Sequence, residues 1–269
     1  MKFSGVLIAS DIDGTLLGSD ERVSPKNIEA IKYFTENGGR FTVSTGRSLQ
    51  TFSDLAGRIP MNAPAIHANG ALLYDHAQKR VISERFMPEI IKRVVPDVSQ
   101  RYPDVCTEIY PVDRKTYAYR INQVSLDHFA RVKIDYIKID SIFDIEQNWT
   151  KIFMTGVREL IEEVKGYLLE TYPQFRYVYS GPEYLELIPV EIDKGRGVFT
   201  LAEMLGIKRE NIYTVGDYEN DLELLGAAKI AFAPSNAVPA VLERADIILP
   251  SNDEDAIAAM IEHLGEIYR

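Results

Sequence analysis

Two carboxylates, Asp11 and Asp13, lie one residue apart in the stretch IASDIDGTLLGSD, where an apolar run ends and a glycine follows. Like charges held this close resist joint ionisation unless a cation or a proton lies between them. The pair therefore indicates either a cation site or an acid/base site in which one carboxyl carries a proton. The isolated stretch also fits a plain turn, because Asp and Gly are common turn residues.

Further residues that suit ionic chemistry follow along the chain. Thr45 offers a hydroxyl and, with Gly46, backbone N–H groups at a predicted helix start, where anions are favoured. Lys194 stands at the entrance of another predicted helix and supplies a positive charge. Asp217 and Asp221 both lie in the segment GDYEND. Taken singly, each has an ordinary structural reading, such as a helix cap or a solvated charge, so the argument rests on their combination.

Alternating strands and helices are predicted for the first third of the chain. Residues 6–9 form a short strand of the buried type, and SPKNIEAIKYFTENGG forms a helix with Ser24 as N-cap and Pro25 at its first position. RFTVSTGR is a second strand, followed by a helix from Leu49 to Leu55. This order favours a parallel sheet, because helices connect its strands.

The last third repeats the alternation. NIYTVGD, KIAFA and DIILP are predicted strands, and KGRGVFTLAEMLG, ENDLELLGAA, AVPAVLERA and DEDAIAAMIEHLGEIY are predicted helices. The sequence therefore predicts an α/β fold with a doubly wound parallel sheet. In such a sheet functional residues gather outside the carboxyl ends of the strands. Asp11, Thr45 and Asp217 stand at predicted strand ends, so we expect them to meet in space.

A segment of different character interrupts this series. It is rich in strands and tyrosines, as in KTYAYRI, WTKIFMTG and FRYVYSGPEYLELIP. It also contains an amphipathic helix whose predicted apolar face consists of Val157, Leu160, Ile161, Val164 and Leu168. We therefore predict a catalytic core of residues 1–82 and 188–269 and an inserted α+β cap domain of residues 83–187.

Composition limits the classes of function. The 269 residues carry a formal net charge of −10, which disfavours a general affinity for nucleic acid or for anionic membranes. The single cysteine, Cys106, cannot form an internal disulfide, and the N-terminal stretch runs into charge too soon for a signal peptide. These features predict a cytoplasmic protein with a small-molecule substrate and no obligate protein partner.

The motifs together resemble those of one family. DIDGTLL, STGR, the lysine of EIDKG and GDYEND occur in the order typical of the haloacid dehalogenase superfamily. HANGALLYD and SNDEDAIAAMI extend the similarity to the Cof-type phosphatases, which have a large α/β cap. The similarity covers the core on both sides of the insert, and the cap is matched only by its size, position and α+β character. The resemblance implies an Mg²⁺-dependent phosphatase that forms a phospho-aspartate intermediate.

The carboxylates fit this chemistry. A nucleophilic Asp11 would form an acyl phosphate, which water attacks more easily than an ester. Asp13 would protonate the leaving alkoxide and later take a proton from the attacking water. Asp11 and Asp217 are the expected side-chain ligands of Mg²⁺. The resemblance adds the backbone carbonyl of Asp13 as a ligand and Asp221 as support for the metal.

The phosphate would be held by Thr45, Gly46 and Lys194, and the resemblance adds Asn220 to this set. One segment departs from the family pattern. A glycine-asparagine-alanine run is common after the strand here written KIAFA, whereas this chain has APSNA at residues 233–237. Any contact carried by that turn, including one from Asn236, is therefore in doubt.

Two other functions remain open from the sequence. A phosphosugar mutase or phosphotransferase would share every core residue and differ only in the acceptor of the phosphoryl group. A receiver-like switch also uses an acceptor aspartate, Mg²⁺, a threonine and a lysine, but it needs neither Asp13 nor a large insert. Three further residues have structural readings: His67 as a hydrogen-bonded histidine, Cys106 as an unreactive thiol and Trp149 as a packing residue.

Overall fold

The structure is a computed structural model of the chain and describes residues 1–112 and 114–268. Its contacts divide the chain into two compact units. The first unit consists of Met1–Gly46, Asp54–Ser83 and Asp193–Arg269, and the second of Arg47–Ser53 and Glu84–Ile192. Of the insert predicted over residues 83–187, residues 84–187 lie in the second unit.

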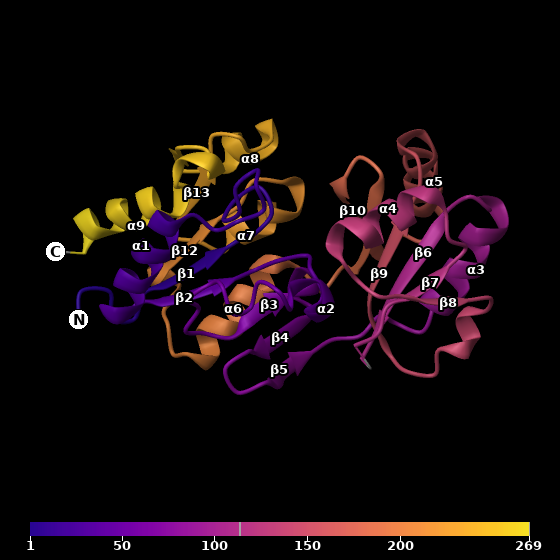
Figure 1. The fold of residues 1–269 in the computed structure, drawn as a ribbon, viewed down its shortest axis with the longest axis horizontal. Helices are drawn as coiled ribbons and strands as arrows, with labels where there is room; N and C mark the ends of the chain where they lie inside the picture. Colours follow the sequence, from indigo (N-terminus) through magenta and orange to yellow (C-terminus); the bar gives the residue numbers. More distant parts are fainter. Residues whose placement is uncertain (113, 269) are drawn as a thin grey trace. The chain divides into compact units, whose positions relative to one another are not determined.

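The first unit is built on a five-stranded parallel sheet (Figure 1). Its strands, in sheet order, are β14 (Ile247–Leu249), β13 (Ile230–Pro234), β12 (Ile212–Val215), β1 (Leu7–Ser10) and β2 (Arg40–Val43). Strand β1 pairs with β12 on one side and with β2 on the other, so the segments that follow these three strands leave the same edge of the sheet. The predicted doubly wound α/β fold is confirmed.

Helices cover both faces of this sheet. On one face α6 (Lys194–Met204) and α7 (Leu222–Gly226) share a hydrophobic core with Leu7 and Ala9 of β1. On the other face α1 (Pro25–Glu36) packs against α9 (Ala256–Ile267), as Figure 1 shows in indigo and yellow. The short helix α8 (Pro239–Arg244) packs beside α7. Burial of this apolar surface is the main force that holds the sheet and helices together.

A small antiparallel sheet adjoins β2. Its strands are β3 (Ala65–His67), β4 (Leu72–Asp75) and β5 (Arg80–Glu84), and the 3₁₀ turn η1 (Ala68–Gly70) joins the first two. The backbone N–H of Thr45 donates to the carbonyl of Ile66 over 2.9 Å, which ties β3 to the residues just after β2. These three strands were not predicted from the sequence. The other 3₁₀ turns are η2 (Ile142–Asp144), η3 (Arg209–Asn211), η4 (Glu219–Asp221) and η5 (Asn252–Glu254).

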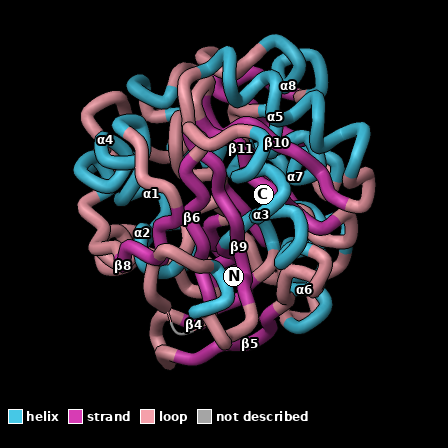
Figure 2. Tube along the Cα trace, turned by 90° about the vertical axis from the view of Figure 1, so that its right-hand side faces the viewer, coloured by secondary structure: helices cyan, strands magenta, loops and turns pink. Residues whose placement is uncertain are grey.

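The second unit contains a six-stranded mixed sheet. Its strands, in sheet order, are β10 (Phe175–Gly181), β11 (Tyr184–Pro189), β9 (Trp149–Thr155), β6 (Cys106–Pro111), β7 (Tyr117–Tyr119) and β8 (Ile137–Ile139). Figure 2 shows the central strands β6, β9 and β11 side by side. Helices α3 (Ile91–Arg101) and α5 (Arg158–Thr171) pack on this sheet through a large apolar cluster. Helix α4 (Gln123–Val132) contacts it through His128, whose Nδ1 lies 3.0 Å from Glu108.

Several elements differ from the predictions. Helix α2 (Leu49–Phe52) ends before Leu55, and helix α7 is only five residues long because the predicted helix begins with the 3₁₀ turn η4. In α5 the side chains of Ile161, Val164 and Leu168 are buried as predicted, whereas Val157 precedes the helix and is exposed.

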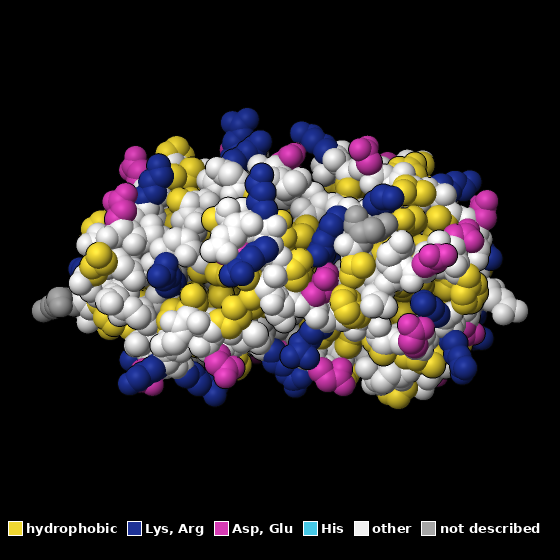
Figure 3. All heavy atoms as spheres, turned by 90° about the horizontal axis from the view of Figure 1, so that it is seen from below, with side chains coloured by type: hydrophobic (Ala, Val, Ile, Leu, Met, Phe, Trp, Pro, Cys, Tyr) yellow, Lys and Arg dark blue, Asp and Glu magenta, His cyan; other side chains and the backbone are white. Residues whose placement is uncertain are grey.

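The surface carries charges of both signs. On the face shown in Figure 3, Lys and Arg side chains are interspersed with Asp and Glu rather than gathered in one patch. Among the described residues, no helix has the length and apolar character needed to cross a bilayer.

Candidate active site

Three carboxylates converge at the carboxyl edge of the parallel sheet. Asp11 directly follows β1, Asp217 follows β12, and Asp221 ends the turn η4. One oxygen from each of the three lies within 4.8 Å of the others. The structure thus brings Asp11 and Asp217 together as the strand pattern predicts. Asp221, which the resemblance implies as support for the metal, lies at the same point.

Lys194 bridges two of these carboxylates. It is the first residue of α6, and Asp193 caps that helix by accepting from the backbone N–H of Arg196. The side chain is only 1% exposed, and its Nζ donates to Asp11 Oδ1 and to Asp221 Oδ1, both over 2.6 Å. A buried ammonium needs such partners, because an isolated charge inside a protein is strongly disfavoured. The alternative reading of Lys194 as a solvated charge is wrong.

Asp221 organises the turn that carries it. Its Oδ2 accepts from the backbone N–H groups of Asp217 and Tyr218, both over 3.1 Å, while its Oδ1 accepts from Lys194. The neighbouring Gly216 allows this close approach, since a Cβ there would lie 2.5 Å from the Asp221 side chain. Asp221 therefore fixes the positions of Asp217 and Lys194.

Two neighbours of Asp217 come from the segment after Asp13. Thr15 Oγ1 donates to Asp217 Oδ1 over 2.6 Å. Gly14 has a φ of +82°, and a Cβ at this position would lie 2.4 Å from Asp217 Oδ2. Sequence reasoning missed Thr15, because its hydroxyl meets a partner 202 residues away and no local pattern marks that contact. Gly14 is required both for its left-handed backbone and for the close approach of Asp217.

The turn that departs from the family pattern does make structural contacts. Asn236 Nδ2 donates to the backbone carbonyl of Gly14 over 2.8 Å, and its Oδ1 accepts from the backbone N–H of Asn252 over 2.9 Å. The doubt about a structural contact from Asn236 is therefore removed, because this side chain joins the turn after β13 to the segment that holds Gly14.

Burial and neighbouring charges act on the ionisation of Asp11 and Asp217. Burial, followed by the charge of Asp221, raises the pKa of Asp217 to about 7 and raises the pKa of Asp11 well above its usual range. Burial alone would lower the pKa of Lys194, but Asp11 and Asp221 raise it above its ordinary value, so the ammonium stays charged. One ammonium faces three carboxylates, and the cluster therefore favours either an additional cation or a proton. Hard oxygen donors at this spacing fit a divalent cation such as Mg²⁺.

Asp13 and Thr45 occupy different surroundings. Asp13 is exposed, and its charge contributes to the raised pKa values of Asp11 and Asp217. The accessible carboxyl group of Asp13 is thus close enough to the buried carboxylates to influence their ionisation.

Thr45 is buried just beyond β2, where the backbone N–H of Ser44 donates to the carbonyl of Ser10 over 2.8 Å.

The expectation for the backbone of Thr45 and Gly46 needs a correction. Helix α2 begins only at Leu49, and its N-cap is Ser48, whose hydroxyl oxygen accepts from the backbone N–H of Thr51. The N–H groups of Thr45 and Gly46 therefore lie in the loop before the helix rather than at its start. With only four residues, α2 also contributes little dipole.

Asn220 and Asn69 join two distant segments. Asn220 lies in η4, and its Nδ2 donates to Asn69 Oδ1 over 3.3 Å. The backbone N–H of Asn69 donates to the carbonyl of Thr45 over 3.0 Å. Asn69 was not predicted as a site residue, although the Asn-Gly pair in HANGALLYD is a turn signal that marks an unusual backbone.

The residues given structural readings behave as follows. His67 is buried, and its Nε2 lies 3.0 Å from Nε2 of His76, so it has the hydrogen-bonding role expected of it. Burial raises the pKa of Cys106 to about 12, which leaves little of the reactive thiolate. Trp149 is buried in the apolar cluster of the second unit. The predictions for Cys106 and Trp149 are confirmed.

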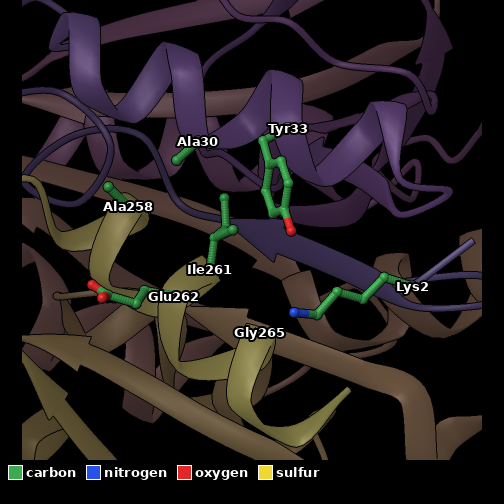
Figure 4. Close-up of a pocket in the computed structure, with 7 residues that line it drawn as sticks. All are labelled: Lys2, Ala30, Tyr33, Ala258, Ile261, Glu262 and Gly265. Carbon is green, nitrogen blue, oxygen red and sulfur yellow. The ribbon is translucent and has the colours of Figure 1, made fainter. Parts of the chain in front are cut away.

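A separate hollow lies between α1 and α9 (Figure 4). It has a volume of about 340 Å³. Its lining consists of Lys2, Ala30, Tyr33, Ala258, Ile261, Glu262 and Gly265. None of these residues belongs to the carboxylate cluster of Asp11, Asp217 and Asp221.

Comparison with known proteins agrees with this geometry. The sequence matches the family model of the haloacid dehalogenase-like hydrolases over residues 8–261. It is 29% identical to the 5-amino-6-(5-phospho-D-ribitylamino)uracil phosphatase YwtE of Bacillus subtilis, with 96% of this chain and 97% of that protein covered.

Solved structures show the same fold. A haloacid dehalogenase-like hydrolase from Bacteroides thetaiotaomicron superposes with a TM-score of 0.85 at 26% identity, covering 96% of this chain and 99% of the other. TM0651 from Thermotoga maritima gives a TM-score of 0.81, also at 26% identity, with 96% and 97% covered. The family match over nearly the whole sequence confirms the resemblance found in the motifs, and the chain belongs to the haloacid dehalogenase-like hydrolases.

Proposed function

We propose that this enzyme is a metal-dependent phosphatase that hydrolyses small phosphomonoesters through a phospho-aspartate at Asp11. The observation that carries the proposal is the buried cluster in which Lys194 bridges Asp11 and Asp221 beside Asp217. Phosphoryl transfer depends mainly on positioning and on charge neutralisation. The cluster fixes the position of Asp11, and Lys194 together with a bound cation would supply the neutralising charge. An exposed carboxyl group, Asp13, stands close enough to affect the ionisation of Asp11.

In the first half of the reaction Asp11 acts as the nucleophile. Its ammonium partner Lys194 fixes one oxygen and leaves the carboxylate oriented for attack on phosphorus. As the ester bond breaks, Asp13 donates a proton to the leaving alkoxide, which makes departure of a poor leaving group feasible. The product of this half is an aspartyl phosphate at Asp11 and a free alcohol.

In the second half Asp13 acts as the base. Having lost its proton, it takes one from the water that attacks the aspartyl phosphate, and inorganic phosphate is released. Lys194, Thr45, Gly46 and Asn220 are the groups proposed to bind the phosphate oxygens. They would stabilise the charge that spreads over these oxygens in the transition state.

A divalent cation completes the proposed site. Asp11 and Asp217 would hold Mg²⁺ through their side chains and Asp13 through its backbone carbonyl, with Asp221 supporting the arrangement. The cation, when bound, lowers the repulsion between carboxylate and phosphate and keeps both ligand carboxylates ionised. The raised pKa values of Asp11 and Asp217 in the protein alone are what such a site is expected to show before a cation neutralises it.

For the substrate we propose a phosphorylated sugar or a related metabolite. The name of the relative YwtE specifies a phosphorylated ribityl chain attached to a uracil ring, which makes that compound the first to test. The second unit would act as the cap that selects the organic part of the substrate and excludes bulk water.

The test is phosphate release with a panel of esters in the presence of Mg²⁺. The panel should include 5-amino-6-(5-phospho-D-ribitylamino)uracil, several sugar phosphates and p-nitrophenyl phosphate. We expect turnover that is abolished by chelator and by Asp11→Asn, but kept by Asp54→Asn, which changes an exposed carboxylate. Turnover by Asp11→Asn, or no release from any ester, would refute the proposal. Uptake of a single phosphoryl group per chain would indicate a switch, and phosphate transfer to a sugar would indicate a phosphotransferase.

A further inference from the structure

The turn between β3 and β4 has an uncommon backbone. Ala68, Asn69 and Gly70 have φ values of 49°, 54° and 102°, so three consecutive residues lie in the left-handed region. Residues other than glycine seldom adopt this conformation, and alanine has no side-chain group to compensate for it. Such a backbone persists only where the surrounding structure holds it, and it often marks a functional segment. The contacts of this turn are therefore informative.

The turn contacts three segments that carry proposed site residues. The backbone N–H of Asn69 donates to the carbonyl of Thr45 over 3.0 Å. Asn69 Oδ1 accepts from Asn220 Nδ2 over 3.3 Å. Gly70 lies against the start of α6, since a Cβ there would be 2.2 Å from the carbonyl oxygen of Asp193 and 3.5 Å from the backbone nitrogen of Lys194.

Close packing on α6 fixes the turn from the other side. A Cβ at Gly197 would lie 2.6 Å from Ile66 Cγ2 and 3.2 Å from Gly70 Cα. Both glycines are therefore needed for this distance between helix and turn. The side chain of Asn69 is buried, so little room is left for it to change its rotamer.

We infer that Asn69 is a positioning residue for phosphate binding, acting through the side-chain amide of Asn220 and the backbone of Thr45. The inference rests on the proposed function, in which Thr45 and Asn220 contact phosphate oxygens. The amide nitrogen of Asn220 carries two hydrogens, and its bond to Asn69 uses one of them. That bond fixes the plane of the amide, so the second hydrogen points in a set direction instead of rotating about the side chain.

Asn69→Gly is the variant that separates the side chain from the backbone. Glycine adopts the left-handed conformation readily, so the turn and its bond to Thr45 can persist while Oδ1 is removed. Lys79→Gly is the matched control. Lys79 also has a positive φ, of 52°, and it lies exposed in the turn between β4 and β5, away from the site residues. A loss of folding stability that both variants share would reflect the added conformational freedom that glycine gives the unfolded chain.

A double-mutant cycle that combines Asn69→Gly with Asn220→Ala measures how far the two residues act together in phosphate binding. We expect Asn69→Gly to raise the inhibition constant for inorganic phosphate about five-fold, as the loss of one neutral hydrogen bond predicts. When Asn69→Gly is made in the Asn220→Ala variant, it should change the inhibition constant by less than about two-fold, because the Asn220 amide that Asn69 orients is already absent. Lys79→Gly should leave the constant unchanged. A merely structural role would give the same factor with and without Asn220.

An NMR measurement separates failure of this inference from failure of the proposed function. The side-chain amide signals of Asn220, identified by their loss in Asn220→Ala, should shift in Asn69→Gly and stay in place in Lys79→Gly. The inference is overturned if the Asn220 signals do not move in Asn69→Gly. It is also overturned if the wild-type enzyme is active but Asn69→Gly raises the inhibition constant by the same factor in the wild type and in Asn220→Ala. If the signals shift but the wild-type enzyme releases no phosphate from any ester, the proposed function has failed, and with it the role in phosphate binding.

Discussion

Without a divalent cation, the carboxylate cluster should make the protein less stable as the pH rises from about 5 to about 8. Burial and the charge of Asp221 raise the pKa of Asp217 to about 7 and that of Asp11 well above its usual range. Both groups therefore hold a proton in the folded protein at a pH where the unfolded chain has released it. The folded state binds more protons, and stability must fall with rising pH.

The size of the effect follows from the pKa of Asp217. Its ordinary value is 3.8, so the loss of stability runs from near this value up to about 7. One pH unit corresponds to about 1.4 kcal/mol for a single group. Between about pH 5 and about pH 7, ionisation of Asp217 alone should lower the free energy of unfolding by roughly 2 kcal/mol. Asp11 adds a loss of the same sign.

Urea denaturation across this pH range, in chelator and in excess Mg²⁺, measures the effect. In Mg²⁺ the cation should hold the carboxylates ionised. The free energy of unfolding measured in Mg²⁺ should therefore exceed that measured in chelator by an amount that grows as the pH rises. Asp217→Asn should weaken the dependence of stability on pH in chelator and reduce the stabilisation by Mg²⁺. The control Asp54→Asn, which alters an exposed carboxylate, should behave like the wild type. Curves in chelator and in Mg²⁺ that stay parallel from pH 5 to pH 8 would refute the reasoning.

Three further predictions concern individual residues. Asp13→Asn should slow turnover of an alkyl phosphate by about 10²- to 10⁴-fold. It should still give a burst of p-nitrophenol from p-nitrophenyl phosphate in rapid mixing, because that leaving group needs no proton. Equal losses for both esters and no burst would contradict the role of Asp13. Gly14→Ala should displace Asp217 and lower kcat by about 100-fold, whereas Gly57→Ala, which has open space around its Cβ, should be neutral in the same assay. Burial should keep Cys106 unreactive toward iodoacetamide until the protein unfolds, so rapid labelling of the native protein, followed by mass spectrometry, would show the burial to be wrong.

The meeting of Asp11 and Asp217 could be predicted because it follows from the geometry of a parallel sheet. Each residue ends a short apolar strand, and neighbouring parallel strands deliver such residues to one edge. The place of Lys194 at the start of α6 could also be predicted, since the preceding Asp193 is a good N-cap. Local signals were sufficient where one short segment determines the position of a side chain.

Other features depend on contacts between distant segments, and no local pattern reveals them. Thr15 matters through its bond to Asp217, and Asn69 through its bond to Asn220. Helix α3 was missed for a different reason: Pro96 lies inside it, and proline normally argues against a helix interior. The helix forms nonetheless because a large apolar cluster buries one of its faces.

The pairing of β1 with β12 constrains the order in which the protein can assemble. Leu7 pairs with Ile212, so β1 must wait for a strand that is synthesised long after it. The sheet of the second unit, in contrast, lies within the continuous stretch Glu84–Ile192 and can form while synthesis continues. Chains arrested before β12 should therefore contain a protease-resistant second unit and a protease-sensitive N-terminal segment, and resistance of that segment would contradict this order. Asp11, the proposed nucleophile, and Asp217, a proposed metal ligand, therefore meet only after β12 has joined the sheet, so nascent chains lack the assembled carboxylate cluster.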